Sequence, residues 1–171
     1  DSFQQSLQGE GKKIVLLNFP NNPSGYSLTN TEAEQILKII KSAAEQKQIL
    51  VICDDAYFGL FYEEDVYQES LFAKLADLHE NVLAVKVDGA TKEDYVWGLR
   101  LGFLTYGAKN IDQNSLTALE EKTAGAIRGN LSSGCHLSQS LLLEAFSSPE
   151  YQQEKEDKCL ILKSRYQKVK E

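Results

Sequence analysis

Four short segments of the sequence carry residue types that could do chemistry, and they follow one another in a fixed order. They are Pro20–Gly25 (PNNPSG), Asp54–Tyr57 (DDAY), the single amine of Lys92, and Arg100, which precedes Leu101-Gly102. A lysine amine can act as a nucleophile and as a base. A guanidinium can bind a phosphate through two parallel hydrogen bonds, which an ammonium does not reproduce.

The elements between these segments predict how they are positioned. Apolar runs at 13–19, 49–53 and 82–87 have the length and composition of strands covered on both faces. Helices are expected between them, one opened by a capping box of Thr29 and Glu32, and one with Leu71, Leu75 and Leu78 on one face. Strands that alternate with helices predict a parallel sheet, and ligands bind beyond the carboxyl ends of such strands.

The rest of the chain predicts a mixed sheet and further helices. The loop before residues 101–106 is too short for a crossover helix, so this fourth strand is expected to run antiparallel. Leu116, Leu119, Thr123 and Ile127 fall on one face of a later helix, and Ser148-Pro149 opens a last helix with a stripe of Cys159, Leu162, Tyr166 and Val169. The predicted fold class is α/β, a three-layer sandwich with a mostly parallel mixed sheet.

Together, the four segments resemble the class I/II, fold-type I, pyridoxal phosphate-dependent aminotransferases, in which the lysine likewise precedes the arginine by eight positions. The resemblance runs from about Ile14 to the end of the chain. It implies that residues 1–148 are part of the large, cofactor-binding domain, with residues 1–12 frayed. It also implies that residues 149–171 form a helix leading toward a small domain that the chain does not include.

The resemblance implies a role for each matched residue. Lys92 would form a Schiff base with pyridoxal 5'-phosphate and later move the substrate α-proton, and Asp54 would keep the pyridine nitrogen protonated. Tyr57 and Asn22 would hydrogen-bond the ring oxygen of the cofactor, and Asn22 would also contact substrate. Arg100 would bind the phosphate. Lys92, Asp54 and Tyr57 are thus the expected catalytic residues.

Two features depart from the family pattern or match it loosely. Gly89 stands where the family usually has a phosphate-binding serine, so a Gly89 amide or the Thr91 hydroxyl would have to substitute. Arg128–Ser132 resembles the segment that, in aspartate aminotransferases, reaches into the neighbouring subunit's site and binds an acidic substrate. Arg128 is equally explained as a helix-end arginine favoured by the helix dipole. The resemblance also implies a homodimer.

The implied activity is transamination between an amino acid and a 2-oxo acid. Three family features have no counterpart here: the glycine-containing phosphate loop, the aromatic that stacks on the cofactor, and the arginine that binds the substrate carboxylate. The chain alone is therefore expected to be inactive. The alternatives are another pyridoxal phosphate enzyme of this fold, such as a carbon–sulfur lyase or decarboxylase, the aminotransferase-like effector domain of a transcriptional regulator, or a cofactor-free scaffold.

Composition limits the other possibilities. The 171 residues suit one domain, and a formal charge of −7 argues against nucleic-acid or anionic-membrane partners. No apolar stretch approaches the ~20 residues of a membrane span. His79 and His136 lack partners at metal-ligand spacing, so no metal site is expected. Three widely spaced cysteines favour reduced thiols and a cytoplasmic protein, and the lack of methionine suggests an excised segment.

Overall fold

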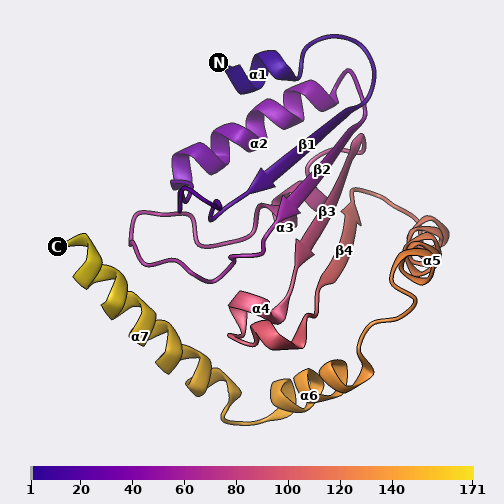
Figure 1. Ribbon diagram of the computed structural model, residues 1–171. Coiled ribbons are helices and arrows are strands. Elements are labelled where there is room, and N and C mark those ends of the chain that lie inside the picture. Colours follow the sequence, from indigo (N-terminus) through magenta and orange to yellow (C-terminus); the bar gives the residue numbers. More distant parts are fainter. Residues whose placement is uncertain (1) are drawn as a thin grey trace.

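The computed structural model describes residues 2–171 and has a four-stranded sheet at its centre, in the order β1-β2-β3-β4 (Figure 1). The strands β1 (Lys13–Asn18), β2 (Ile49–Asp54) and β3 (Val82–Asp88) are parallel. β4 (Phe103–Ala108) pairs antiparallel with β3. The mostly parallel mixed sheet and the direction of its fourth strand are therefore confirmed.

Two helices connect the parallel strands and cover one face of the sheet. α2 (Asn30–Ala44) begins with the expected capping box, in which the Thr29 hydroxyl accepts from the Glu32 amide at 3.2 Å and Glu32 accepts from the Thr29 amide at 2.9 Å. α3 (Leu71–Ala76) is capped by Ser70. Ile40 of α2 and Leu75 of α3 are completely buried, so these helices and the strand residues beneath them form the core.

The opposite face of the sheet is covered only in part. Ile14 and Leu16 of β1 are 67% and 65% exposed, so the expectation that this strand is covered on both faces is wrong. On β4, Gly107 faces Phe72 and Ala76 of α3. The preceding residue, Tyr106, points to the other face and hydrogen-bonds Thr123 of α5 (Gln113–Asn130) at 2.6 Å. Helices thus lie on both faces, but the second layer is limited to the β4 side.

The first described residues form a short helix and add one residue to the core. Residues Ser2–Ser6 form α1, and Leu7 is only 5% exposed in the core. Lys47 donates to the carbonyl of Leu7 at 3.0 Å. The start of the chain thus contains one short helix and a buried leucine, whereas residues 8–12, before β1, are exposed and form no helix or strand. Asp1 lies outside the described residues.

The chain after β3 is helical apart from β4. α4 (Ala90–Glu93) and the single 3₁₀ turn η1 (Trp97–Leu99) precede β4, and α6 (His136–Ser147) and α7 (Tyr151–Lys170) follow α5. Val169 was expected on the packed stripe of the last helix but is 87% exposed, since the end of α7 runs beyond the sheet (Figure 1). Across residues 2–171, no helix combines the length and the apolar character required to cross a membrane.

Candidate functional site

The carboxyl ends of the parallel strands bring the predicted segments to one edge of the sheet. Asn22 lies in the loop that follows β1, Asp54 is the last residue of β2, and Lys92 follows β3 in α4. In the register of the sheet, Asn18, Asp54 and Val87 are neighbours across the three strands. Parallel strands end together, so three segments far apart in the sequence begin from adjacent points.

Lys92 lies against Tyr57 and beside Arg100. The Lys92 Nζ atom is 4.7 Å from the centroid of the Tyr57 ring, within the range of a cation–π contact. A cavity of about 120 Å³ opens at this point. Its lining includes both cationic side chains and is formed by Ala56, Val87, Asp88, Gly89, Thr91, Lys92, Arg100 and Leu101. The residues that line the cavity therefore include an amine, a guanidinium and a hydroxyl, together with the carboxylate of Asp88.

The two adjacent aspartates point to different sides of the sheet. Asp54 is half-buried, and its carboxylate accepts a hydrogen bond from the Ala56 amide at 3.2 Å. Asp55 is 6% exposed on the core side, where the Ser70 hydroxyl donates to it. Burial raises the pKa of Asp55, and the Ser70 hydrogen bond offsets this only in part. The alternation of strand residues places Asp54 on the side of the exposed Leu16.

Asn18 joins the first two segments, and the sequence analysis did not identify it. Its Oδ1 atom accepts from the Asn22 amide at 3.0 Å, while its amide Nδ2 donates to the Asp54 carbonyl at 3.1 Å. Asn22 itself is exposed. The available signal was that Asn18 is the polar last residue of an apolar strand, opposite Asp54 in a parallel pairing.

Gly89 leaves no room for the serine that the family usually has. A Cβ atom at this position would collide with the Leu101 carbonyl oxygen and would lie 3.0 Å from the Gly102 Cα atom. The backbones before Lys92 and after Arg100 therefore approach closely. A serine would require one of these segments to move, so any hydroxyl contribution here falls to Thr91, which lines the same cavity.

Arg128 is not brought to this cavity. It lies in the last turn of α5, where its Nη1 atom donates to the Ser132 hydroxyl at 3.0 Å. α5 sits beside β4, apart from α4 (Figure 1). Within one chain, Arg128 and Lys92 therefore belong to different surfaces.

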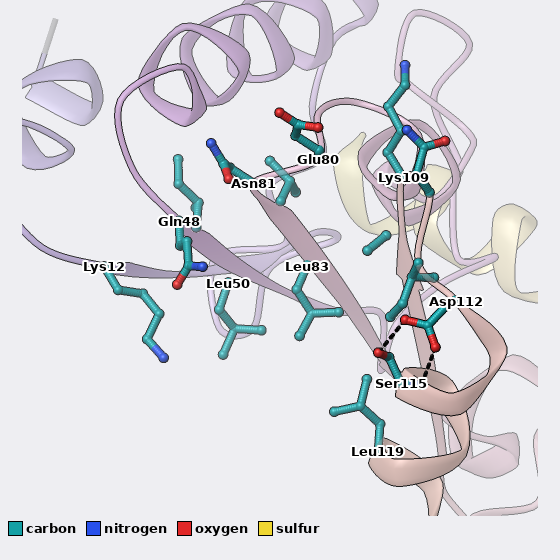
Figure 2. Close-up of a pocket in the computed structure, with 15 residues that line it drawn as sticks. Lys12, Gln48, Leu50, Glu80, Asn81, Leu83, Lys109, Asp112, Ser115 and Leu119 are labelled. Atoms are coloured by element: carbon teal, nitrogen blue, oxygen red, sulfur yellow. Dashed lines mark hydrogen bonds between the residues drawn. The ribbon is translucent and has the colours of Figure 1, made fainter.

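A larger cavity lies at the other end of the sheet. Figure 2 shows this space of about 520 Å³, with Leu50, Leu83 and Leu119 among its apolar lining residues. Of its two acidic residues, Glu80 and Asp112, Asp112 already accepts two hydrogen bonds from Ser115, at 3.0 and 2.7 Å. None of the predicted site residues lines this cavity. Its apolar lining indicates a part of the sheet that is incompletely covered. The smaller cavity at Lys92 has several polar groups around one space and is therefore the candidate site.

Comparisons with known proteins show the family to which the chain is similar. The family model described as aminotransferase class I and II matches residues 2–171. A tyrosine aminotransferase of Caenorhabditis elegans is 30% identical over 72% of this chain and 26% of its own length. An aspartate aminotransferase of Bacillus sp. (strain YM-2) is 30% identical over 81% of this chain and 31% of its own length. The chain thus spans about a quarter to a third of these relatives.

Solved structures show the same fold. An aminotransferase from Anaerococcus prevotii superposes with a TM-score of 0.74 at 29% identity, covering 88% of this chain and 37% of that one. An aromatic-amino-acid aminotransferase from Burkholderia pseudomallei, covalently bound to pyridoxal phosphate, superposes with a TM-score of 0.72 at 19% identity, over 94% of this chain and 39% of that one. Because the family match extends over every described residue, this chain belongs to the class I and II aminotransferases.

Proposed function

We propose that this chain is the cofactor-holding part of an enzyme that transfers an amino group between an amino acid and a 2-oxo acid, using pyridoxal 5'-phosphate. The observation that carries the proposal is the Lys92 amine over the Tyr57 ring, 4.7 Å from its centroid, in a cavity that also contains Arg100. The Burkholderia pseudomallei structure, with its covalently bound cofactor, supports the choice of cofactor.

The donor set around Lys92 fits such a cofactor. A phosphate dianion needs cations and hydrogen-bond donors, and Arg100, Lys92 and the Thr91 hydroxyl line one cavity of about 120 Å³. The lack of a Cβ atom at Gly89 keeps the backbone close to this space. We assign phosphate binding to Arg100, assisted by Thr91. Asp54, whose carboxylate is oriented by the Ala56 amide, would face the ring nitrogen.

When bound, the cofactor would supply an aldehyde that links amines and a protonated ring that accepts the electron pair left at the substrate α-carbon. Lys92 would hold the cofactor through its amine. The same amine would act as the base that takes the substrate α-proton and returns it. Asp54 would hold the ring nitrogen in its protonated form. Tyr57 and Asn22 would donate hydrogen bonds to the ring oxygen.

The finer assignments follow from the same proposal. Asn22 would contact the substrate as well as the cofactor. Arg128, which lies apart from Lys92 in this chain, would bind a substrate carboxylate in the site of a second copy, so the protein would act as a homodimer. Residues 1–148 would form part of the large domain, and 149–171 would lead toward a small domain. The free Cys53, Cys135 and Cys159 suit a reducing, cytoplasmic setting.

Absorbance titration with pyridoxal phosphate tests this function. The lysine-linked cofactor has a visible band, and borohydride reduction fixes it so that peptide mapping can locate it. We expect the band and a modified Lys92 in the wild type, and neither in Lys92→Ala. Lys158→Ala, at an exposed position of α7, is the matched control and should behave like wild type. No band, or modification at another lysine, would leave a cofactor-free scaffold as the better interpretation.

A further inference from the structure

The helix α7 contacts α4 through a cluster of half-buried charges. Lys155 Nζ lies 3.0 Å from the Glu93 carboxylate and 3.2 Å from that of Asp94. The Tyr151 hydroxyl donates to the same Asp94 carboxylate. Exposure of these side chains is 25% for Lys155, 24% for Glu93 and 8% for Asp94. Ion pairs shielded to this degree are less weakened by solvent than pairs on an open surface.

The cluster is attached to the turn that carries Lys92. Glu93 and Asp94 follow Lys92 directly in the chain, and α4 has only four residues. A helix of this length has no stability of its own, and Gly89 offers no side-chain cap at its start. The orientation of the Lys92 side chain therefore depends on contacts from outside α4.

Electrostatics favour the paired state of the cluster. Burial lowers the pKa of Lys155, but the hydrogen bond and charge of Glu93, together with the charge of Asp94, outweigh burial and raise it overall. The cation thus stays protonated between two carboxylates. Without it, Glu93 and Asp94 would remain shielded from water as uncompensated like charges, a state that the turn could relieve only by opening.

The same helix also contacts the segment that follows Tyr57. The ring of Tyr166 lies 5.2 Å from that of Tyr62, and the Tyr166 hydroxyl donates to Glu63 at 2.6 Å. One helix is therefore attached to both segments that bring Lys92 and Tyr57 together. Figure 1 shows α7 passing along this end of the molecule, with its first turns nearest α4.

We propose that Lys155 and Tyr151 are positioning residues, which hold Glu93 and Asp94 and thereby present the Lys92 amine to Tyr57 and the cofactor. The inference rests on the proposed function for the role of Lys92. The attachment itself does not depend on any cofactor. It can therefore be measured separately, on the chain without added ligand.

Two measurements on Lys155→Met test the inference. In hydrogen exchange followed by mass spectrometry, amides 90–96 should exchange about tenfold faster than in wild type, because hydrogen bonds to a charged group are lost. The rate at which borohydride-fixed pyridoxal phosphate accumulates on Lys92 should fall about three- to tenfold. Lys155→Arg keeps the charge and should restore both rates. Lys158→Met, on the exposed side of α7, should resemble wild type.

The outcomes separate this inference from the proposed function. Unchanged exchange at residues 90–96 in Lys155→Met, or no rescue by arginine, would overturn the positioning role. If Lys155→Met does not fold, Tyr151→Phe removes only one hydroxyl and should accelerate the same amides about threefold; failure to do so would equally overturn it. If wild-type Lys92 takes up no cofactor, the proposed function fails, while the exchange data still decide the attachment.

Discussion

The two faces of the sheet are built from alternate residues of the same strands but have different environments. On the face covered by α2 and α3, Val15 and Val51 are 7% and 0% exposed. On the other face, Ile14 and Leu16 are more than half exposed. Both sets are equally apolar in the sequence. A continuous apolar run therefore shows that both faces of a strand can be buried, but not that both are. In this chain the helices cover one face fully and the other only beside β4.

The two aspartates at the end of β2 also lie on different faces of the sheet. Asp55 belongs to the covered face and is part of the core, where Ser70 satisfies it. Asp54 belongs to the open face, in register with Asn18 and Val87. The proposed cofactor contact therefore lies on the side of the sheet that this chain leaves accessible. These two neighbouring aspartates thus have different roles: Asp55 is part of the core, and Asp54 is the proposed cofactor contact on the opposite face.

The largest effect is expected from truncating matched isoleucines on the two faces. Ile49 is 1% exposed, so Ile49→Ala should lower the free energy of unfolding by about 3 kcal/mol through lost burial and the cavity it leaves. Ile14→Ala, on the open face, should change it by no more than about 0.5 kcal/mol. Urea denaturation measures both. Equal losses would mean that the open face is covered in solution.

The open face should also promote self-association. β1 is an edge strand, and among residues 2–171 no strand pairs with its outer side. Leu16→Lys should weaken association about tenfold, because it replaces an exposed apolar side chain with a charge. Light scattering over a concentration series measures this. Val169→Lys, at an 87% exposed position of α7, is the control and should leave association unchanged. A clean wild-type monomer at high concentration would contradict the prediction.

A smaller effect is expected from the cap of the helix that covers the buried face. Thr29→Ala removes the hydroxyl that accepts from the Glu32 amide at the start of α2, and should cost about 1 kcal/mol of unfolding free energy. Thr31→Ala, at an exposed position in the same helix, is the matched control and should cost less. Thermal melts of both variants measure the loss of stability. Similar losses in the two variants would exclude the cap as the cause.

The smallest effect concerns the pH dependence that Asp55 adds to the covered face. Burial raises the folded pKa of Asp55 above its ordinary value of 3.8. At pH values between 3.8 and the folded pKa, the folded state therefore holds more protons than the unfolded state. Its contribution to stability is present at low pH and is lost as pH rises through the folded pKa. Asp55→Asn should gain stability relative to wild type as pH increases from about 4 to 7. A pH-independent difference between their urea midpoints would contradict this.

Much of the fold and of the site could be predicted, because the signals are local. The capping box of Thr29 and Glu32 and the strand–helix alternation each involve residues close in sequence. Parallel strands then bring Asn22, Asp54 and Lys92 to one edge as a consequence of topology. Asn18 was missed because its partners depend on register, yet its place opposite Asp54 follows once the strands are paired.

The sequence by itself determined the four strands, the longer helices, their order, the mixed sheet and the edge at which the candidate site lies. Only the tertiary structure decided which face is covered, that Leu7 belongs to the core, and that Gly89 must lack a side chain. It also decided that Lys155 contacts Glu93, 62 positions earlier. The physical reason is that periodicity and capping act within a few residues, whereas burial and ion pairing depend on which distant surfaces meet.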